Sequence, residues 1–231
     1  MTRRQNPDMA FANRQDAGRR LASALERFRD KSPVVLALPR GGVPIGYEIA
    51  VALGCPLDIV LVRKLGAPDQ PELAAGAVVD GERPEIVINE DVASALDLSA
   101  DFFERAARRE LAEIARRRGL YLPGRTHPVL AGKTVILADD GIATGATARA
   151  ALRAVRRQKP AKLVLAVPVA PPETIAELAP ECDEVVCLTQ PLDFGAIGFY
   201  YADFHQMDDA EVVALLERAA ALSGTEKPPS R

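Results

Sequence analysis

Cysteines, aromatic residues and long apolar runs are all scarce in this sequence. Its three cysteines, Cys55, Cys182 and Cys187, are odd in number and form no C-x-x-C pair, which argues against both a disulfide framework and a zinc site. No segment approaches the roughly 20 consecutive apolar residues that a transmembrane helix needs, and no apolar signal core follows the first four residues. We therefore expect a cytoplasmic protein in a reducing compartment, with no membrane partner.

The chain also lacks an excess of positive charge. It has 29 lysines and arginines against 32 aspartates and glutamates, a net charge of −3, so no general attraction draws it to nucleic acid. At 231 residues, with 48% hydrophobic and 26% charged residues, it is long enough to bury a full core and is close to the globular average. We expect a single domain spanning residues 1–231 and no nucleic-acid partner.

Two common nucleotide-binding loops are absent as well. A Walker A loop needs a lysine after its second glycine, but Gly145 is followed by Ala146, and no G-x-G-x-x-G fingerprint follows a predicted strand. The stretch 135–147 instead contains an apolar run, the adjacent carboxylates Asp139 and Asp140, and a loop with two glycines and two threonines. An alanine-rich helical pattern follows, so this stretch predicts a strand, a loop and a helix.

The loop has the chemistry of an anion site. Glycines allow positive φ and carry no Cβ, so a ligand can approach the backbone, where the free amides of a helix N-terminus attract negative charge. A phosphate monoester would fit there. The two carboxylates only accept hydrogen bonds and suit the vicinal hydroxyls of a sugar, so the pattern predicts a ribose 5-phosphate site. Two alternatives stay open: an ordinary βα turn with solvated acids, and an acidic pair that binds a metal, as in receiver domains.

The order of apolar strand, Asp-Asp and x-x-x-Thr-Gly-x-Thr resembles the phosphoribosyl pyrophosphate motif of the type I phosphoribosyltransferases. The overall layout looks like that of predicted bacterial phosphoribosyltransferases of uncharacterised activity, and the resemblance covers residues 33–190. It implies that Asp139 and Asp140 hold the 2′ and 3′ hydroxyls of the ribose. It further implies that five residues bind the 5′-phosphate: Ala143, Thr144, Gly145, Ala146 and Thr147.

A second strand, loop and helix precede this stretch. The apolar run 34–38 is followed by Arg40, Gly41 and Gly42, and a helical pattern covers 45–53. An arginine beside glycine amides suits a doubly charged anion, although a tight turn with a solvated arginine would have the same sequence. In the family, the loop after the first core strand binds pyrophosphate, often through a strained or cis peptide, and the resemblance assigns that role to these three residues.

The next apolar run, 57–62, is predicted to be a buried strand that ends in Arg63 and Lys64. Ligands of open α/β sheets bind at the carboxyl ends of strands, so both cations are candidates for pyrophosphate binding. The polar segment 66–72 contains two prolines and a glycine and predicts a mobile flap, which family members close over the reaction. A hairpin is predicted next, with strands over 74–79 and 86–89.

Apolar runs alternate with helical patterns from residue 34 to residue 189. This alternation predicts an α/β protein with an open, mostly parallel sheet, helices on both faces and right-handed crossovers. The carboxyl ends of the strands then lie on one rim, which brings the two loops together. Outside this core we expect a covering helix over 11–28, a helical insertion over 99–120, a hood from 66–89 and 190–206, and a terminal helix over 208–222.

Several arginines have two interpretations. Arg14, Arg19 and Arg20 lie on the covering helix and are interpreted as solvated, although each could reach a phosphate. The run 116–118 ends the helical insertion and is interpreted as a solvated helix end, where cations favour the dipole, rather than as an RNA site or a second phosphate site.

The histidines and the C-terminal aromatic residues are also ambiguous. His127 and His205 show no nucleophile or metal-ligand partner in the sequence. Phe199 and Tyr200 belong to an aromatic cluster in a chain with only 5% aromatic residues, so they are candidates for stacking on a planar base. Packing inside a small hood is the alternative.

We therefore expect a phosphoribosyltransferase that moves 5-phosphoribose from phosphoribosyl pyrophosphate to a small planar base and releases pyrophosphate. Its catalytic residues would be Asp139, Asp140, Lys64 and Arg40. The resemblance implies Mg²⁺ held mainly through substrate and water, with no direct protein ligand, and a homodimer. Enzymes of the family that act on 6-oxopurines carry an acid where this chain has Ala143, so the loop looks more like that of adenine or orotate enzymes. The alternatives are a regulatory protein that binds phosphoribosyl pyrophosphate without catalysis, and a ribose-phosphate or pyrophosphate hydrolase.

Overall fold

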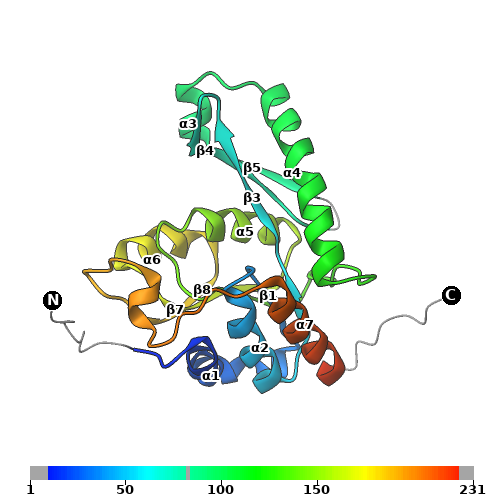
Figure 1. The fold of residues 1–231 in the computed structure, drawn as a ribbon, viewed down its shortest axis with the longest axis vertical. Helices are drawn as coiled ribbons and strands as arrows, with labels where there is room; N and C mark the ends of the chain where they lie inside the picture. The colour runs from blue at the N-terminus through cyan, green and yellow to red at the C-terminus, as the bar shows by residue number, and fades with distance from the viewer. Residues whose placement is uncertain (1–9, 82–83, 224–231) are drawn as a thin grey trace.

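The computed structural model describes residues 10–81 and 84–223, and a five-stranded parallel sheet forms its centre (Figure 1). The order across the sheet is β2-β1-β6-β7-β8, and each neighbouring pair is parallel. The strands are β1 Val34–Ala37, β2 Leu57–Ile59, β6 Thr134–Ala138, β7 Lys162–Val169 and β8 Glu184–Thr189. The expected open parallel sheet of an α/β protein is confirmed.

Helices cover both faces of this sheet because its strands are apolar on both sides. In β1, Val35 and Ala37 belong to one buried cluster and Val34 and Leu36 to the other, as the two-residue period of a strand requires. Residues of α1, α2 and α7 join the first cluster, and residues of α5 and α6 join the second. These helices are α1 Arg14–Leu25, α2 Gly42–Leu53, α5 Ala146–Arg157, α6 Pro172–Leu178 and α7 Asp209–Ser223. Short 3₁₀ helices lie at Glu26–Lys31, Ala179–Glu181 and Ile197–Tyr200.

Residues 62–121 form a lobe that projects from the sheet beside α5 (Figure 1). Its antiparallel strands have the order β3-β4-β5, and α3 and α4 flank them. These elements are β3 Val62–Ala67, β4 Gln70–Val79, β5 Glu85–Ile88, α3 Glu90–Ala95 and α4 Ala100–Tyr121. All of the lobe's strands contact α5, so the lobe rests on the helix that follows the predicted phosphate-binding loop.

Two predictions for this region are wrong. The strand expected over 57–62 is interrupted, because β2 ends at Ile59 and β3 begins at Val62 in the other sheet. The flap expected over 66–72 is the end of a hairpin in which β3 and β4 pair, with register shifts on either side of Gly66, and a tight turn joins them. An apolar run does not reveal the sheet in which it pairs, so its pattern could not show this break. The mobility of the flap stays a prediction.

The other predicted helices and strands are present, with small differences at their ends, whereas a hood formed by 66–89 and 190–206 stays a prediction. Strands β4 and β5 form the expected hairpin, although residues 82–83 lie outside the described chain. Ser99 precedes α4, and its hydroxyl accepts a hydrogen bond from the Phe102 amide at 3.3 Å, which caps the helix. The predicted tail at 224–231 also lies outside the described residues. No helix in the described ranges is long and apolar enough to cross a membrane.

Candidate functional site

The two predicted ligand loops meet at the carboxyl ends of β1 and β6, which are neighbours in the sheet. A Cβ on Gly41 would lie 2.1 Å from Oδ2 of Asp140, and a Cβ on Gly42 would lie 2.7 Å from the carbonyl oxygen of Ala138. Neither position has room for a side chain, so the glycines let the β1–α2 loop, residues 38–41, lie directly against the end of β6. The expected convergence of these two loops on one rim is confirmed.

The β6–α5 loop, residues 139–145, presents several backbone amides that donate to no acceptor among the described residues. Gly145 has a φ of +74°, a left-handed conformation that glycine adopts without strain, and α5 begins at the next residue. Within the described chain, the amides from 143 to 148 donate to no protein acceptor. Thr144 and Thr147 are exposed beside them. Free amides at the N-terminus of a helix form an anion-binding site.

Contacts from β7 and α6 hold this loop in shape. The Ile142 amide donates to the Val169 carbonyl at 2.9 Å, and the Thr174 hydroxyl donates to the Ala143 carbonyl at 2.7 Å. A Cβ on Gly145 would lie 3.0 Å from Cγ2 of Thr174, so this side of the loop is closely packed. The conformation of the loop is therefore held by contacts within the protein.

Asp139 and Asp140 stand side by side at the end of β6. Asp139 is half-buried, and its Oδ1 accepts a hydrogen bond from the Asp140 amide at 2.9 Å. Burial and the neighbouring Asp140 carboxylate raise the pKa of Asp139 well above its ordinary value. Burial also raises the pKa of Asp140, while the Arg14 guanidinium opposes that rise.

Arg14 is buried against Asp140, so its interpretation as a solvated arginine is wrong. The residue is 9% exposed, its Nε donates to Oδ2 of Asp140 at 2.7 Å, and its Nη1 donates to the His205 carbonyl at 2.8 Å. The sequence did contain a signal. Arg14 precedes Ala17 and Leu21 by three and seven residues, and this spacing places all three on one face of a helix. The other two arginines of α1 are exposed, as expected: Arg19 and Arg20.

Arg40 is exposed on the rim, next to a Pro39–Arg40 peptide bond that is cis, a feature that the resemblance includes for this loop. Its Nη1 lies 4.0 Å from Oδ1 of Asp209, at the start of α7. The Gly42 amide donates to the Leu38 carbonyl at 2.9 Å and closes the turn. A long ion pair in solvent contributes little, so a ligand can compete for this guanidinium. Its role in pyrophosphate binding stays a prediction.

Arg63 and Lys64 lie within β3, so the prediction that they end a core strand is wrong. Successive side chains of a strand point to opposite faces of its sheet. Arg63 Nε donates to Oε2 of Glu110 on α4 at 2.6 Å. Lys64 instead lines a cavity of about 450 Å³ together with Thr144 and Thr147. Lys64 therefore faces the β6–α5 loop, whereas Arg63 faces α4 and pairs with Glu110.

Phe199 and Tyr200 differ in accessibility. Phe199 is 61% exposed, whereas Tyr200 is 6% exposed. The Tyr200 ring stacks on Phe194 with their centres 5.6 Å apart, and its hydroxyl donates to the Phe194 carbonyl at 2.9 Å. Tyr200 thus packs in the core, which was the alternative interpretation. Phe199 remains a candidate for stacking on a ligand.

Arg118 and His127 have partners that the sequence did not reveal. Arg118 lies near the end of α4 between two acids, with its Nη2 3.0 Å from Oδ2 of Asp58 and its Nη1 3.0 Å from Oδ2 of Asp80. Its side chain is nearly buried, so the interpretation as a solvated helix end is wrong for this residue. His127 Nε2 is 3.4 Å from Oδ1 of Asp80. This cluster joins α4 to the core sheet and contains no nucleophile.

Known proteins resemble this chain over most of its length. The family model described as the phosphoribosyl transferase domain matches residues 10–203. Two curated proteins of Mycobacterium tuberculosis, from strains CDC 1551 and H37Rv, bear the names "Putative phosphoribosyl transferase" MT0597 and Rv0571c. Each is 45% identical to this chain over 228 residues, which is 96% of this chain and 51% of the relative. The chain thus spans about half the length of the curated relatives that it matches.

Among solved structures, the protein TT1426 of Thermus thermophilus superposes on this fold with a TM-score of 0.80. The two chains are 43% identical, and the match covers 90% of this chain and 98% of the other. The parallel sheet, the β6–α5 loop and these matches lead to one conclusion. The chain belongs to the phosphoribosyl transferase domain family.

Proposed function

We propose that the chain is a phosphoribosyltransferase that moves 5-phosphoribose from phosphoribosyl pyrophosphate (PRPP) to a nitrogenous acceptor and releases pyrophosphate. The observation that carries this proposal is the row of amides from 143 to 148, which donate to no acceptor in the part of the chain that the structure describes and follow a carboxylate pair on the rim of a parallel sheet. Free amides at a helix N-terminus bind a phosphate, and carboxylates accept hydrogen bonds from a diol. Membership of the family supports the same class of reaction.

Each part of PRPP has a matching part of the site. The 5′-phosphate would lie on the β6–α5 loop amides and the hydroxyls of Thr144 and Thr147. Asp139 and Asp140 would accept hydrogen bonds from the ribose hydroxyls. Lys64 lines the same cavity as both threonines, so its charge would act near the 5′-phosphate. Arg40 and the β1–α2 loop would bind the pyrophosphate.

Displacement at the anomeric carbon passes through an oxocarbenium-like state, as in glycoside chemistry. Positive charge grows on the ribose ring while negative charge grows on the departing pyrophosphate. Asp139 and Asp140 would stabilise the first, and Arg40 would stabilise the second. The β3–β4 hairpin would close over the reaction and exclude water, which otherwise hydrolyses the intermediate.

Mg²⁺ would enter with the substrate. The described residues contain no group of three or more His, Cys, Asp or Glu side chains that could hold a metal ion, so the ion would depend on oxygens of PRPP. Mg²⁺ prefers oxygen ligands, keeps several waters and is commonly held through substrate phosphates. When bound, it would neutralise charge on the leaving pyrophosphate.

The acceptor would be a small planar base. Phe199, 61% exposed, offers a ring on which such a base could stack. Ala143 stands where the 6-oxopurine enzymes of the family carry an acid, so this chain would recognise its base by other contacts. A screen of individual bases, with pyrophosphate release as the readout, would identify the acceptor.

Calorimetric titration of the chain with PRPP and Mg²⁺ tests the binding step. Wild type should bind, and Asp139→Asn should weaken binding by about 10- to 100-fold, the factor that a hydrogen bond to a charged group contributes. Asp30→Asn is the matched control, because Asp30 is exposed in the 3₁₀ helix after α1. Its affinity should equal that of wild type.

The base screen then separates the possible activities. Pyrophosphate release that requires one base and Mg²⁺ supports transfer. Binding of PRPP without release in the presence of any base would indicate a regulatory protein, and release without a base would indicate a hydrolase. If wild type fails to bind PRPP at all, the proposal is rejected.

A further inference from the structure

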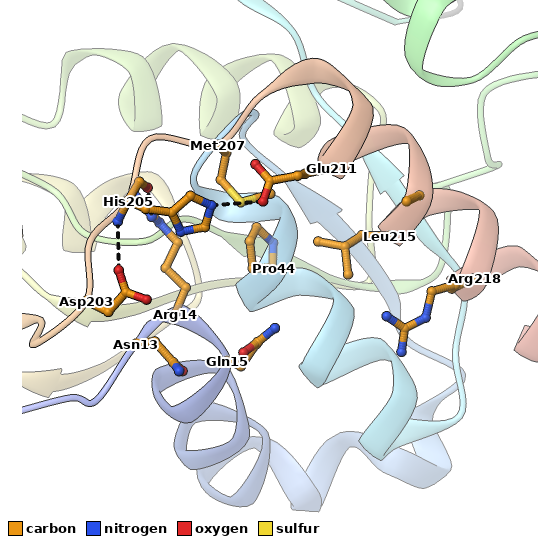
Figure 2. Close-up of a pocket in the computed structure, with 11 residues that line it drawn as sticks. Asn13, Arg14, Gln15, Pro44, Asp203, His205, Met207, Glu211, Leu215 and Arg218 are labelled. Carbon is orange, nitrogen blue, oxygen red and sulfur yellow. Dashed lines mark hydrogen bonds and ion pairs between the residues drawn. The ribbon is translucent and has the colours of Figure 1, made fainter.

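Neither the PRPP motif nor the proposed function uses Arg14, yet it lies directly behind Asp140. It is the first residue of α1, and 126 residues separate it from Asp140 in the chain. Its Nε donates to Oδ2 of Asp140 at 2.7 Å and its Nη1 to the His205 carbonyl at 2.8 Å. The centre of the Phe204 ring lies 3.9 Å from its guanidinium carbon. Figure 2 shows the side chain extending from α1 towards His205.

The Asp140 carboxylate is confined on two sides. On one side is the backbone of the β1–α2 loop, since a Cβ on Gly41 would lie 2.1 Å from Oδ2. On the other side is the Arg14 guanidinium. The main chain is held as well, because the Tyr201 hydroxyl donates to the Asp140 carbonyl at 2.5 Å. A side chain held in this way keeps one direction relative to the rim.

The contact between Arg14 and Asp140 also affects the charge of the Asp140 carboxyl group. Asp139 adjoins it on β6, Tyr201 covers it from the C-terminal segment, and Arg14 reaches it from α1. Burial disfavours the charged form of a carboxyl group, and an opposite charge in contact favours it. Arg14 supplies that opposite charge. An ionised carboxylate is the form that accepts two hydrogen bonds from a diol.

A cavity next to Arg14 leaves room for substitutions that test its contact with Asp140. A cavity of about 260 Å³ lies between α1, α2 and α7, and Arg14 forms part of its wall (Figure 2). His205 Nε2 and Oε1 of Glu211 lie 2.9 Å apart at its edge. A shorter or neutral side chain at position 14 can therefore be accommodated without overpacking.

We infer that Arg14 is a positioning residue for Asp140: it fixes the direction of the carboxylate that would receive the ribose hydroxyls and favours the charged form of that carboxylate. The expected effect of Arg14 on PRPP binding rests on the proposed function, whereas the effect of Arg14 on the Asp140 carboxylate rests on the contacts alone. A purely structural role would be to tie α1 to the segment 203–205 through the His205 carbonyl.

Arg14→Met and Arg14→Lys distinguish these roles, and Arg19→Met is the matched control because Arg19 is exposed on the same helix. Methionine removes the charge and the donors, whereas lysine keeps the charge as a single point. Arg14→Met should weaken calorimetric binding of PRPP with Mg²⁺ by about 10- to 100-fold. Arg14→Lys should recover part of the loss, and Arg19→Met should bind as wild type does.

A second readout needs no ligand. Titration of the Asp140 carboxyl by ¹³C NMR in the free protein reports its midpoint directly. Loss of an opposite charge in contact raises such a pKa by about one to three units, so the midpoint in Arg14→Met should rise by that amount. The rise should be smaller in Arg14→Lys and absent in Arg19→Met.

The two readouts separate failure of the inference from failure of the proposed function. If Arg14→Met folds with the wild-type midpoint and affinity, or loses only thermal stability, Arg14 is structural and the inference is overturned. If wild type does not bind PRPP, the proposed function fails, while the midpoints still decide whether Arg14 controls the carboxylate. Should Arg14→Met not fold, Arg14→Lys decides: a shift in midpoint or affinity supports the inference, and no shift in either overturns it.

Discussion

Gly41→Ala adds one methyl group at the point where the two ligand loops touch. The backbone of Gly41 has φ −61° and ψ −34°, which any residue adopts, so no conformational strain accompanies the change. The effect of the change is a steric clash, because the new Cβ would lie 2.1 Å from Oδ2 of Asp140. A carbon and an oxygen normally approach to about 3.3–3.6 Å, so one of the two loops must move by roughly 1 Å.

The structure offers two ways to relieve this clash. Rotating the Asp140 carboxylate away would break its ion pair with Arg14 and leave a buried charge, which costs about 3–5 kcal/mol. Shifting the β1–α2 loop is an overpacking change, which costs about 1–3 kcal/mol. The second route costs less and should prevail. We therefore expect a loss of about 1–3 kcal/mol in the free energy of unfolding.

Denaturant and thermal unfolding measure this loss. Each kcal/mol should lower the melting temperature by about 2–4 °C in a chain of this size. The control is Gly119→Ala, since Gly119 lies inside α4 and an added Cβ there meets no atom within 4 Å. Alanine favours a helix over glycine by about 1 kcal/mol, so this variant should be as stable as wild type or more so.

Catalysis should suffer more than stability in Gly41→Ala. A displacement of roughly 1 Å in a positioning loop can lower the rate about 100-fold, so kcat/KM for PRPP should fall by that order. A Gly41→Ala protein with the stability of wild type and its kcat/KM for PRPP would refute the reasoning. It would mean that the two loops are not in contact at this point.

Two further predictions concern α4. Arg118→Met should lower the free energy of unfolding by about 3–5 kcal/mol, because Asp58 and Asp80 would stay buried without their cation. The control is Arg116→Met, which should cost less than about 1 kcal/mol because Arg116 is exposed. Equal denaturant midpoints for the two variants would contradict this prediction. The pKa of Glu113 is lowered to about 2 by hydrogen bonds from arginines of the same helix, Arg116 first. The Glu113 carboxylate thus stabilises the folded chain above its ordinary pKa of 4.5, and this stabilisation is lost as pH falls towards 2. Glu113→Gln should be less stable than wild type at pH 6, by a difference that shrinks towards pH 2; a difference independent of pH would argue against this.

Elements with a local signal were predictable from the sequence. The β6–α5 loop is one, because an apolar run, two carboxylates, two glycines and a helical pattern follow one another without interruption. Helix α2 is another: a helical pattern was expected over 45–53, and the helix spans Gly42–Leu53. The alternation of strands and helices also predicted the parallel sheet, since right-handed crossovers leave few other arrangements. For the loop and the helix, the information lies within a short stretch of neighbouring residues.

The tertiary structure alone decided which charged residues pair across long stretches of the chain. Arg14 meets Asp140 across 126 positions, and Arg118 meets Asp58 across 60. Lys64 faces the β6–α5 loop and Arg63 does not, because a break after β2 moved both into a second sheet.

The physical reason is that periodicity reports whether a face is buried but not what lies opposite it. Burial of a charge is tolerated only when an opposite charge comes from elsewhere in the fold. The local pattern could therefore name the loop that we propose to bind phosphate. It could not name the arginine from the first helix that holds one of the loop's acids in place.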